Sequence, residues 1–343
     1  MSATTTLPLE LPPGARVLVT GGTGFTGAAL LRSLARQPVA IRAIARPGSN
    51  LDPLKDLDVE WFRGQVYDPA VVSAAARDVQ FIFHVAAAYR EAGLSDQEQR
   101  NVHVVSTRLL AEAAAANPGF KRMVHVSTVG VHGHIDHPPA DENYPFNPGD
   151  MYQRTKAEAE LWLRDFARQT GLPCTVIRPC AIYGPGDRRL LKVFQMATYP
   201  VFVLLGRGQC LYHLVHVEDL VRMMISAANH PAAINEAFIC GDPEAITLET
   251  MGRIIADELG RPLRVVRLPA WPFFLAAGVC EAICRPLKIT PPIYRRRVAF
   301  FTKDRSFDTR KIRQTLGYSY LHDTEQGVRE TARWYVREGW IRL

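Results

Sequence analysis

The chain has 343 residues, of which 47% are hydrophobic and 22% charged. This composition is typical of globular proteins, and it excludes a disordered chain, a collagen and a simple coiled coil. The length predicts two domains, or one large domain with an insert. The net charge of +7 is modest, and we expect no nucleic-acid partner. The densest basic run, Arg295 to Arg297, is interpreted as a solvated face.

The cysteines and the N-terminal segment predict a cytoplasmic protein. None of the six cysteines forms a CxxC pair, so we interpret them as reduced core residues. Residues Met1 to Ala15 lack the basic start and apolar run of a signal peptide. The longest uncharged apolar stretch, Leu268 to Cys280, is shorter than the roughly 20 residues needed to span a bilayer.

Strand-like and helical segments alternate through the first half of the chain. The predicted strands are Arg16–Thr20, Val39–Ala45, Val59–Phe62, Val79–Val85, Arg122–Ser127 and Cys174–Arg178. The predicted helices are Gly27–Arg36, Val71–Ala76, Glu98–Ala115 and Met151–Arg168. This alternation predicts an α/β fold, a doubly wound parallel Rossmann sheet with helices on both faces.

The alternation ends after Pro179, where proline and glycine become frequent. We expect a helix at Val217–Asn229 and a strand at Ala237–Cys240 to return to the sheet. Residues 1–181 and 213–242 are therefore assigned to a dinucleotide-binding domain. Residues 182–212 and 243–343 are assigned to a smaller, mostly helical substrate-binding domain.

A glycine-rich loop joins the first strand to the first helix. Its candidate cofactor-binding residues are Gly21, Thr23, Gly24, Phe25, Thr26 and Gly27. Glycines let a pyrophosphate approach the backbone, and the helix N-terminus offers unpaired N–H groups. The position of the loop between a strand and a helix supports dinucleotide binding.

The end of the second strand indicates which dinucleotide is bound. NAD-binding units usually carry Asp or Glu about 20 residues after the loop, whereas this chain has Arg46 there and no acid. A guanidinium suits a 2′-phosphate. We therefore expect NADP, with NAD as the alternative.

The fourth predicted helix carries a YxxxK pair, Tyr152 and Lys156. Residues four apart share one face of a helix, so both side chains are expected to point into one site. The ammonium would favour the tyrosinate and prepare Tyr152 for general acid–base catalysis. Ser127 and Thr128 end the fifth strand, where a hydroxyl can bond a substrate oxygen.

With these residues the chain resembles the extended short-chain dehydrogenase/reductase superfamily, which includes the NAD-dependent epimerase/dehydratase family. Further matching segments are His84–Ala87, Val126–Gly133, Arg178–Gly186, Val215–Asp219, Leu316–Tyr318 and Trp334–Tyr335. The resemblance covers nearly the whole chain and implies hydride transfer with a nicotinamide cofactor. It implies that Thr128 is the catalytic hydroxyl beside Tyr152 and Lys156. The further cofactor contacts that it implies are Gln65, Val66, Ala86, Ala87, Tyr152, Lys156, Pro179 and Ile182.

The sequence departs from the family pattern at three positions and leaves the substrate open. Gln65 replaces a common Asp, His103 an Asn that braces the active-site water, and His132 a Tyr. Val129 and Gly130 follow Thr128 where dehydratases carry Asp-Glu, so dehydration is not expected. Sugar-nucleotide epimerases, dihydroflavonol-reductase-like enzymes and non-enzymatic dinucleotide sensors stay as alternatives, although the Tyr/Lys pair argues against a sensor.

The C-terminal half indicates an apolar substrate. Its apolar stretch is flanked by Arg264, Arg267, Arg285 and Lys288, and it resembles the 3β-hydroxysteroid and sterol-4-carboxylate dehydrogenase branch. A sterol-like ligand is expected, with peripheral membrane contact through 268–284 and a homodimer as further expectations. No metal is expected. For His132, His134 and His137, an HxHxxH set, lining the substrate mouth or solvent exposure is favoured over ligation.

Overall fold

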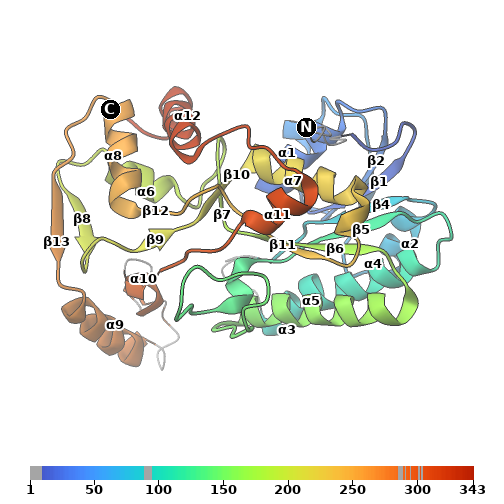
Figure 1. The fold of residues 1–343 in the computed structure, drawn as a ribbon, viewed down its shortest axis with the longest axis horizontal. Coiled ribbons are helices and arrows are strands. Elements are labelled where there is room, and N and C mark those ends of the chain that lie inside the picture. Colours follow the sequence, from blue (N-terminus) through green and yellow to red (C-terminus); the bar gives the residue numbers. More distant parts are fainter. Residues whose placement is uncertain are drawn as a thin grey trace.

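The computed structural model describes residues 10–88, 95–284, 289, 291–293, 295–299, 302 and 304–343. The larger unit is built on a seven-stranded sheet with helices on both faces, and a smaller unit lies beside it (Figure 1). The carboxyl ends of the parallel strands set where a ligand crevice forms in such a sheet.

The sheet has the strand order β11-β6-β5-β4-β1-β2-β3, and all of its pairings are parallel. Its strands are β1 (Arg16–Thr20), β2 (Ala40–Ala45), β3 (Val59–Arg63), β4 (Phe81–His84), β5 (Arg122–Val126), β6 (Cys174–Pro179) and β11 (Ala237–Cys240). The order reverses direction between β1 and β4, which is the switch point where doubly wound sheets bind dinucleotides. The predicted parallel sheet, and the return of residues 237–240 to it, are confirmed.

Helices cover the two faces through separate apolar clusters. One face carries α1 (Phe25–Leu34), α7 (Val217–Asn229) and α11 (Arg310–Leu316), and the other carries α2 (Pro69–Ala76), α4 (Ser106–Ala115) and α5 (Met151–Thr170). In β1, Val17 and Val19 pack into the first cluster and Leu18 into the second. This alternation follows from the two-residue period of a strand whose faces are both covered.

The single regular helix predicted at Glu98–Ala115 is wrong in its start and its middle. The helix begins earlier, at α3 (Asp96–Arg100), because Ser95 and Glu98 form a reciprocal capping box there. A π-helical turn at Asn101–Val105 then separates α3 from α4. Such turns widen the backbone locally and are frequent at functional sites.

The smaller unit consists of short strand pairs and packed helices. The pairs are β7 (Ala181–Tyr183) with β10 (Leu214–His216), β9 (Leu211–Tyr212) with β12 (Ile246–Thr247), and β8 (Phe202–Leu205) with β13 (Val265–Leu268). The helices are α6 (Leu191–Met196), α8 (Leu248–Glu258), α9 (Trp271–Cys284), α10 (Arg295–Ala299) and α12 (Thr324–Arg337). Short 3₁₀ turns lie at Asp52–Leu54, Val129–His132 and Pro231–Ala233. In the described part of the chain, no helix is long and apolar enough to cross a membrane.

Candidate active site

A cavity of about 490 Å³ opens above the switch point of the sheet. Its predicted lining residues are Gly21, Thr23, Gly24, Phe25, Thr26, Gly27, Arg46, Gln65, Val66, Ala86 and Ala87. These come from four separate parts of the chain, which the parallel strand order brings to one edge. The volume falls within the range of small-ligand and cofactor sites.

The backbone of the glycine loop leaves no room for side chains at two positions. Gly21 has φ +73°, and a Cβ there would lie 2.7 Å from the amide nitrogen of Ala86. A Cβ on Gly27 would lie 2.1 Å from the carbonyl oxygen of Gly21, well inside van der Waals contact. No side chain of the described residues caps the first turn of α1. The loop therefore fits a pyrophosphate held by backbone N–H groups at a positive helix end.

The cavity also includes residues that the sequence did not indicate as a site. Arg189 lines it, lies over the ring of Phe25 and donates from Nη2 to the carbonyl of Ile182 at 3.0 Å. Glu98 and Val102, on α3 and the π turn, line it as well. The basic pair Arg188-Arg189 after the glycines of 184–186 is the signal that was available for Arg189.

Lys156 is buried and its ammonium points at the end of β5. Nζ donates to the carbonyl oxygen of Val126 at 2.8 Å, two residues before Thr128. Burial lowers the pKa of Lys156 to about 8. The negative charge of Glu160 acts in the opposite direction and raises it. The lysine is thus close to neutrality under mildly alkaline conditions, unlike a lysine in water.

Thr128 lies two residues after the end of β5, and Tyr152 lies in the first turn of α5. The Thr128 hydroxyl accepts from the amide of Gly130 at 3.0 Å, which caps the 3₁₀ turn at Val129–His132 and leaves its O–H hydrogen for another acceptor. Tyr152 lies one helical turn before Lys156 on α5. Tyr152, Lys156, Thr128, Pro179 and Ile182 are not among the lining residues of the 490 Å³ cavity.

A buried histidine, His103, connects Ala88 of the cavity lining to the helix turn of Tyr152. His103 Nε2 accepts from the amide of Ala88 at 2.9 Å, so its Nδ1–H donates to the Thr155 hydroxyl at 2.7 Å. Its ring meets that of Tyr152 edge-on, with centroids 5.3 Å apart. Burial lowers the pKa of His103 to about 2. The imidazole is therefore neutral, and it positions the helix turn that carries Tyr152.

A second buried histidine, His84, supports the backbone of the cavity at Ala86. Its Nδ1 lies 2.7 Å from the Thr20 hydroxyl, which also accepts from the amide of Ala86 at 3.2 Å. Its Nε2 lies 3.1 Å from the hydroxyls of Ser106 and Thr107, which donate to helix carbonyls. Burial lowers the pKa of His84 to about 3. A neutral histidine therefore fixes the backbone at Ala86, which lines the cavity.

The HxHxxH set does not share one environment. The side chain of His132 is fully buried. It contacts Phe146, Tyr144 and Arg178. His134 is exposed and pairs with Asp136, and His137 is exposed. His132 therefore lies in the core. The expectation that it lines the substrate mouth or is exposed to solvent is wrong.

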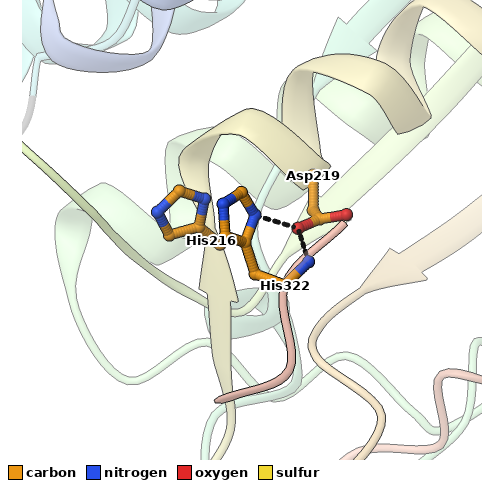
Figure 2. A group of neighbouring side chains, drawn as sticks. All are labelled: His216, Asp219 and His322. Carbon is orange, nitrogen blue, oxygen red and sulfur yellow. Dashed lines mark hydrogen bonds and ion pairs between the residues drawn. The ribbon is translucent and has the colours of Figure 1, made fainter. Parts of the chain in front are cut away.

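Two family-like segments meet away from the cavity, at the start of α7. Asp219 accepts from the Tyr318 hydroxyl at 2.6 Å, from the amide of Leu321 at 2.8 Å and from His322 Nδ1 at 2.9 Å (Figure 2). The ring of His216 packs on that of His322 with centroids 3.9 Å apart. The hydrogen bond that His322 donates to Asp219 raises the pKa of His322. This cluster ties the C-terminal segment to α7 and to the end of β10.

Comparison with known proteins identifies the family to which this chain belongs. Residues 17–241 match the model of the NAD dependent epimerase/dehydratase family. The chain belongs to that family. It is accordingly an NAD(P)-dependent enzyme of the extended short-chain dehydrogenase/reductase type, as the resemblance of its motifs implied.

Curated relatives include steroid and sterol enzymes. A 3beta-hydroxysteroid-dehydrogenase/decarboxylase of Arabidopsis thaliana is 28% identical over 92% of this chain and 61% of its own length. A 3 beta-hydroxysteroid dehydrogenase/Delta 5-->4-isomerase of Mycobacterium tuberculosis is 29% identical over 94% of this chain and 90% of its own. The chain thus spans about three-fifths of the plant relative and most of the bacterial one.

Solved structures share the fold over more than nine-tenths of the chain. The crystal structure of gox2253 superposes with a TM-score of 0.80 at 27% identity, covering 96% of this chain and all of that one. A UDP-glucose 4-epimerase of Thermotoga maritima superposes with a TM-score of 0.71 at 20% identity, covering 94% and 99%. The second similarity concerns the fold alone.

Proposed function

We propose that the enzyme transfers a hydride between NADP and a secondary alcohol or ketone on an apolar, sterol-like molecule. The reaction type is supported by three residues: Lys156, whose ammonium donates to the Val126 carbonyl at the end of β5, Tyr152 one helical turn earlier on α5, and Thr128 two residues after Val126. Val129 and Gly130 follow Thr128, and neither can supply the acid or base that expulsion of water requires.

The residues of this chain supply a proton and hold the substrate oxygen. The bound nicotinamide supplies or accepts the hydride. During reduction, Tyr152 gives its phenolic proton to the carbonyl oxygen, and during oxidation it takes the proton from the hydroxyl. Thr128 donates its O–H to the same oxygen. The ammonium of Lys156 favours the tyrosinate and brings its proton transfer toward neutral pH.

The sterol-like substrate is supported by the relatives and by the segment before β10. Their names indicate 3β-hydroxysteroids, and they align over more than nine-tenths of this chain. His213, near the place where epimerases commonly hold a pyrophosphate with Arg, is buried. Its ring accepts from the amide of Phe307 at 3.1 Å and donates to the carbonyl of Asp242 at 2.7 Å. Both ring nitrogens of His213 are therefore engaged within the protein.

The preference for NADP rests on Arg46. It lies at the rim of the cavity, after β2, with no acid at the end of that strand. A guanidinium there can pair with a 2′-phosphate. Arg46→Ala is expected to weaken NADP binding about tenfold or more, the loss of one charge-assisted bond, and to leave NAD binding nearly unchanged.

The test is to incubate the purified enzyme with NADP or NAD and one of three substrates: a 3β-hydroxysteroid, a dihydroflavonol or a UDP-sugar. The proposal predicts that the steroid is oxidised to a ketone with one reduced cofactor formed per turnover, faster with NADP. Inversion of the UDP-sugar with no net change in cofactor redox state would contradict it and favour an epimerase. A homodimer through α4 and α5, as in the family, is a separate proposal that sedimentation can test.

A further inference from the structure

The side chains that meet at the start of α7 include the donor types of a metal site. His216 ends β10, Asp219 lies in the first turn of α7, and His322 comes just before α12 (Figure 2). One ligand atom of each residue lies within 4.8 Å of those of the other two. Imidazole nitrogens and carboxylate oxygens are donors that zinc-class divalent ions take in proteins. The sequence did not predict this group, because His322 is distant from the other two residues in the chain.

The imidazole of His216 is buried without a hydrogen bond. Its side chain is fully buried, and neither Nδ1 nor Nε2 has a partner among the described residues. The ring packs against that of His322, with centroids 3.9 Å apart, and against that of Tyr183, with centroids 5.3 Å apart. Buried polar atoms without a partner are rare in native proteins, because burial removes their bonds to water. A bound ion would provide one of these nitrogens with a partner.

His322 is oriented like a histidine that binds a metal. Its Nδ1–H donates to the Asp219 carboxylate at 2.9 Å, and Figure 2 shows the other ring nitrogen, Nε2, on the side that faces His216. Metal-binding histidines typically donate their second N–H to a carboxylate, which fixes the ring and its tautomer. Asp219 also accepts from the Tyr318 hydroxyl at 2.6 Å and from the amide of Leu321 at 2.8 Å. The carboxylate that holds the ring is therefore itself held.

Two glutamates lie near Nε2 of His322. Glu330 Oε2, on α12, is 3.4 Å from it, and Glu218 Oε2, on α7, is 3.7 Å from it. Two ligand atoms on one tetrahedral zinc ion are about 3.3 Å apart, since each is about 2.0–2.1 Å from the metal. The glutamate side chains are 44% and 60% exposed, so an ion can reach Nε2 from solvent.

The charges of the cluster favour a divalent cation. Among the described residues, the ion pairs of Glu218, Asp219 and Glu330 are with His322 alone. Three carboxylates therefore surround one imidazole. This excess of negative charge offsets the positive end of α7, which by itself disfavours a cation.

We propose that His216 and His322 bind a divalent ion of the zinc class, with a carboxylate of Glu330 or Glu218 as a further ligand and Asp219 holding the ring of His322. The ion would fasten α12 to the start of α7. None of these residues lines the dinucleotide cavity, and the proposal does not depend on the reaction proposed above. Because two ligands are nitrogens, Zn²⁺ is expected to bind in preference to Mg²⁺ or Ca²⁺, which take oxygen ligands.

The test is thermal unfolding of the full-length protein, first treated with EDTA and dialysed, with and without added Zn²⁺. Zn²⁺ at about a hundred times its Kd is expected to raise the melting temperature by about 4 °C or more, because it binds the folded state. Mg²⁺ and Ca²⁺ are expected to leave it unchanged. Co²⁺ is expected to give the visible absorption of an ion bound by nitrogen and oxygen, without the charge-transfer band of a thiolate ligand.

Two variants remove one nitrogen ligand each. His322→Asn removes Nε2, while its amide nitrogen takes the place of Nδ1 and keeps the bond to Asp219. His216→Leu replaces a ring without hydrogen bonds by an apolar side chain of similar volume, which a buried position tolerates. Both are expected to fold, as circular dichroism verifies. Both are expected to bind Zn²⁺ more than about a hundredfold more weakly, beyond the loss caused by removing a residue that only orients a ligand.

The matched control is His134→Asn. His134 lies in an exposed pair with Asp136, and this variant is expected to bind Zn²⁺ like the wild type. Three results would overturn the proposal. The first is a wild-type melting temperature that Zn²⁺ does not change. The second is Zn²⁺ affinity that His322→Asn and His216→Leu retain, since the ion would then lie elsewhere. The third is a thiolate band with Co²⁺, which would assign the ion to cysteine.

Discussion

Replacing Lys156 by methionine is expected to stabilise the folded protein while removing its activity. Burial lowers the pKa of Lys156 from 10.5 to about 8. Each pKa unit corresponds to about 1.4 kcal/mol, so the buried charge destabilises the folded state by about 3 kcal/mol near pH 7. Methionine removes this penalty but leaves the Val126 carbonyl without its donor, which costs about 1–3 kcal/mol. The net expectation is a gain of about 1 kcal/mol.

The pH dependence separates this reasoning from a simple packing effect. Between pH 8 and 10.5 the unfolded wild-type chain binds more protons at Lys156 than the folded protein does. The stability of the wild type therefore rises with pH across this window, and the Met variant lacks that rise. By pH 10 the wild type is expected to have gained about 2 kcal/mol relative to Lys156→Met.

The assay is urea unfolding of both proteins without cofactor at pH 7 and at pH 10, together with turnover. A variant that is less stable by more than about 1 kcal/mol at pH 7, or a difference between the two proteins that is the same at both pH values, would refute the reasoning. Either result would show that the ammonium is not held as a buried, poorly solvated charge.

Two further predictions concern the loop and the core. Gly27→Ala is expected to weaken cofactor binding at least about a hundredfold, because its Cβ would lie 2.1 Å from the carbonyl oxygen of Gly21; dinucleotide titration that finds unchanged affinity would contradict this. Glu160→Gln is expected to cost about 3–5 kcal/mol in urea unfolding, since it leaves the fully buried Arg178 unpaired. The control Glu158→Gln breaks a half-exposed pair and is expected to cost less than about 1 kcal/mol, so equal losses in both variants would contradict the prediction.

The sheet and glycine loop could be predicted because their signals are local. Continuous apolar strands, glycines between a strand and a helix, and an i,i+4 Tyr/Lys pair each depend on a few neighbouring residues. The strand at Ala237–Cys240 was expected with bounds that the structure reproduces. The predicted loop residues and Arg46 line one cavity.

The features that the sequence did not predict depend mostly on contacts between segments that are distant in the chain. The π turn at Asn101–Val105 places His103 between Ala88 and Thr155, and no periodicity in a single sequence reveals such pairing. His132 was expected to line the substrate mouth or to be exposed to solvent, yet it is buried and contacts Phe146 and Arg178. The capping box at Ser95 was readable from sequence and was missed.

The most direct test of the central claim is single-turnover kinetics of Tyr152→Phe with a 3β-hydroxysteroid, alongside a cofactor titration. The account predicts wild-type affinity for NADP and a loss of hydride transfer of at least about a hundredfold, the usual contribution of a general acid–base group. A variant that reduces the cofactor at the wild-type rate would contradict the assignment of Tyr152, and with it the proposed use of this site.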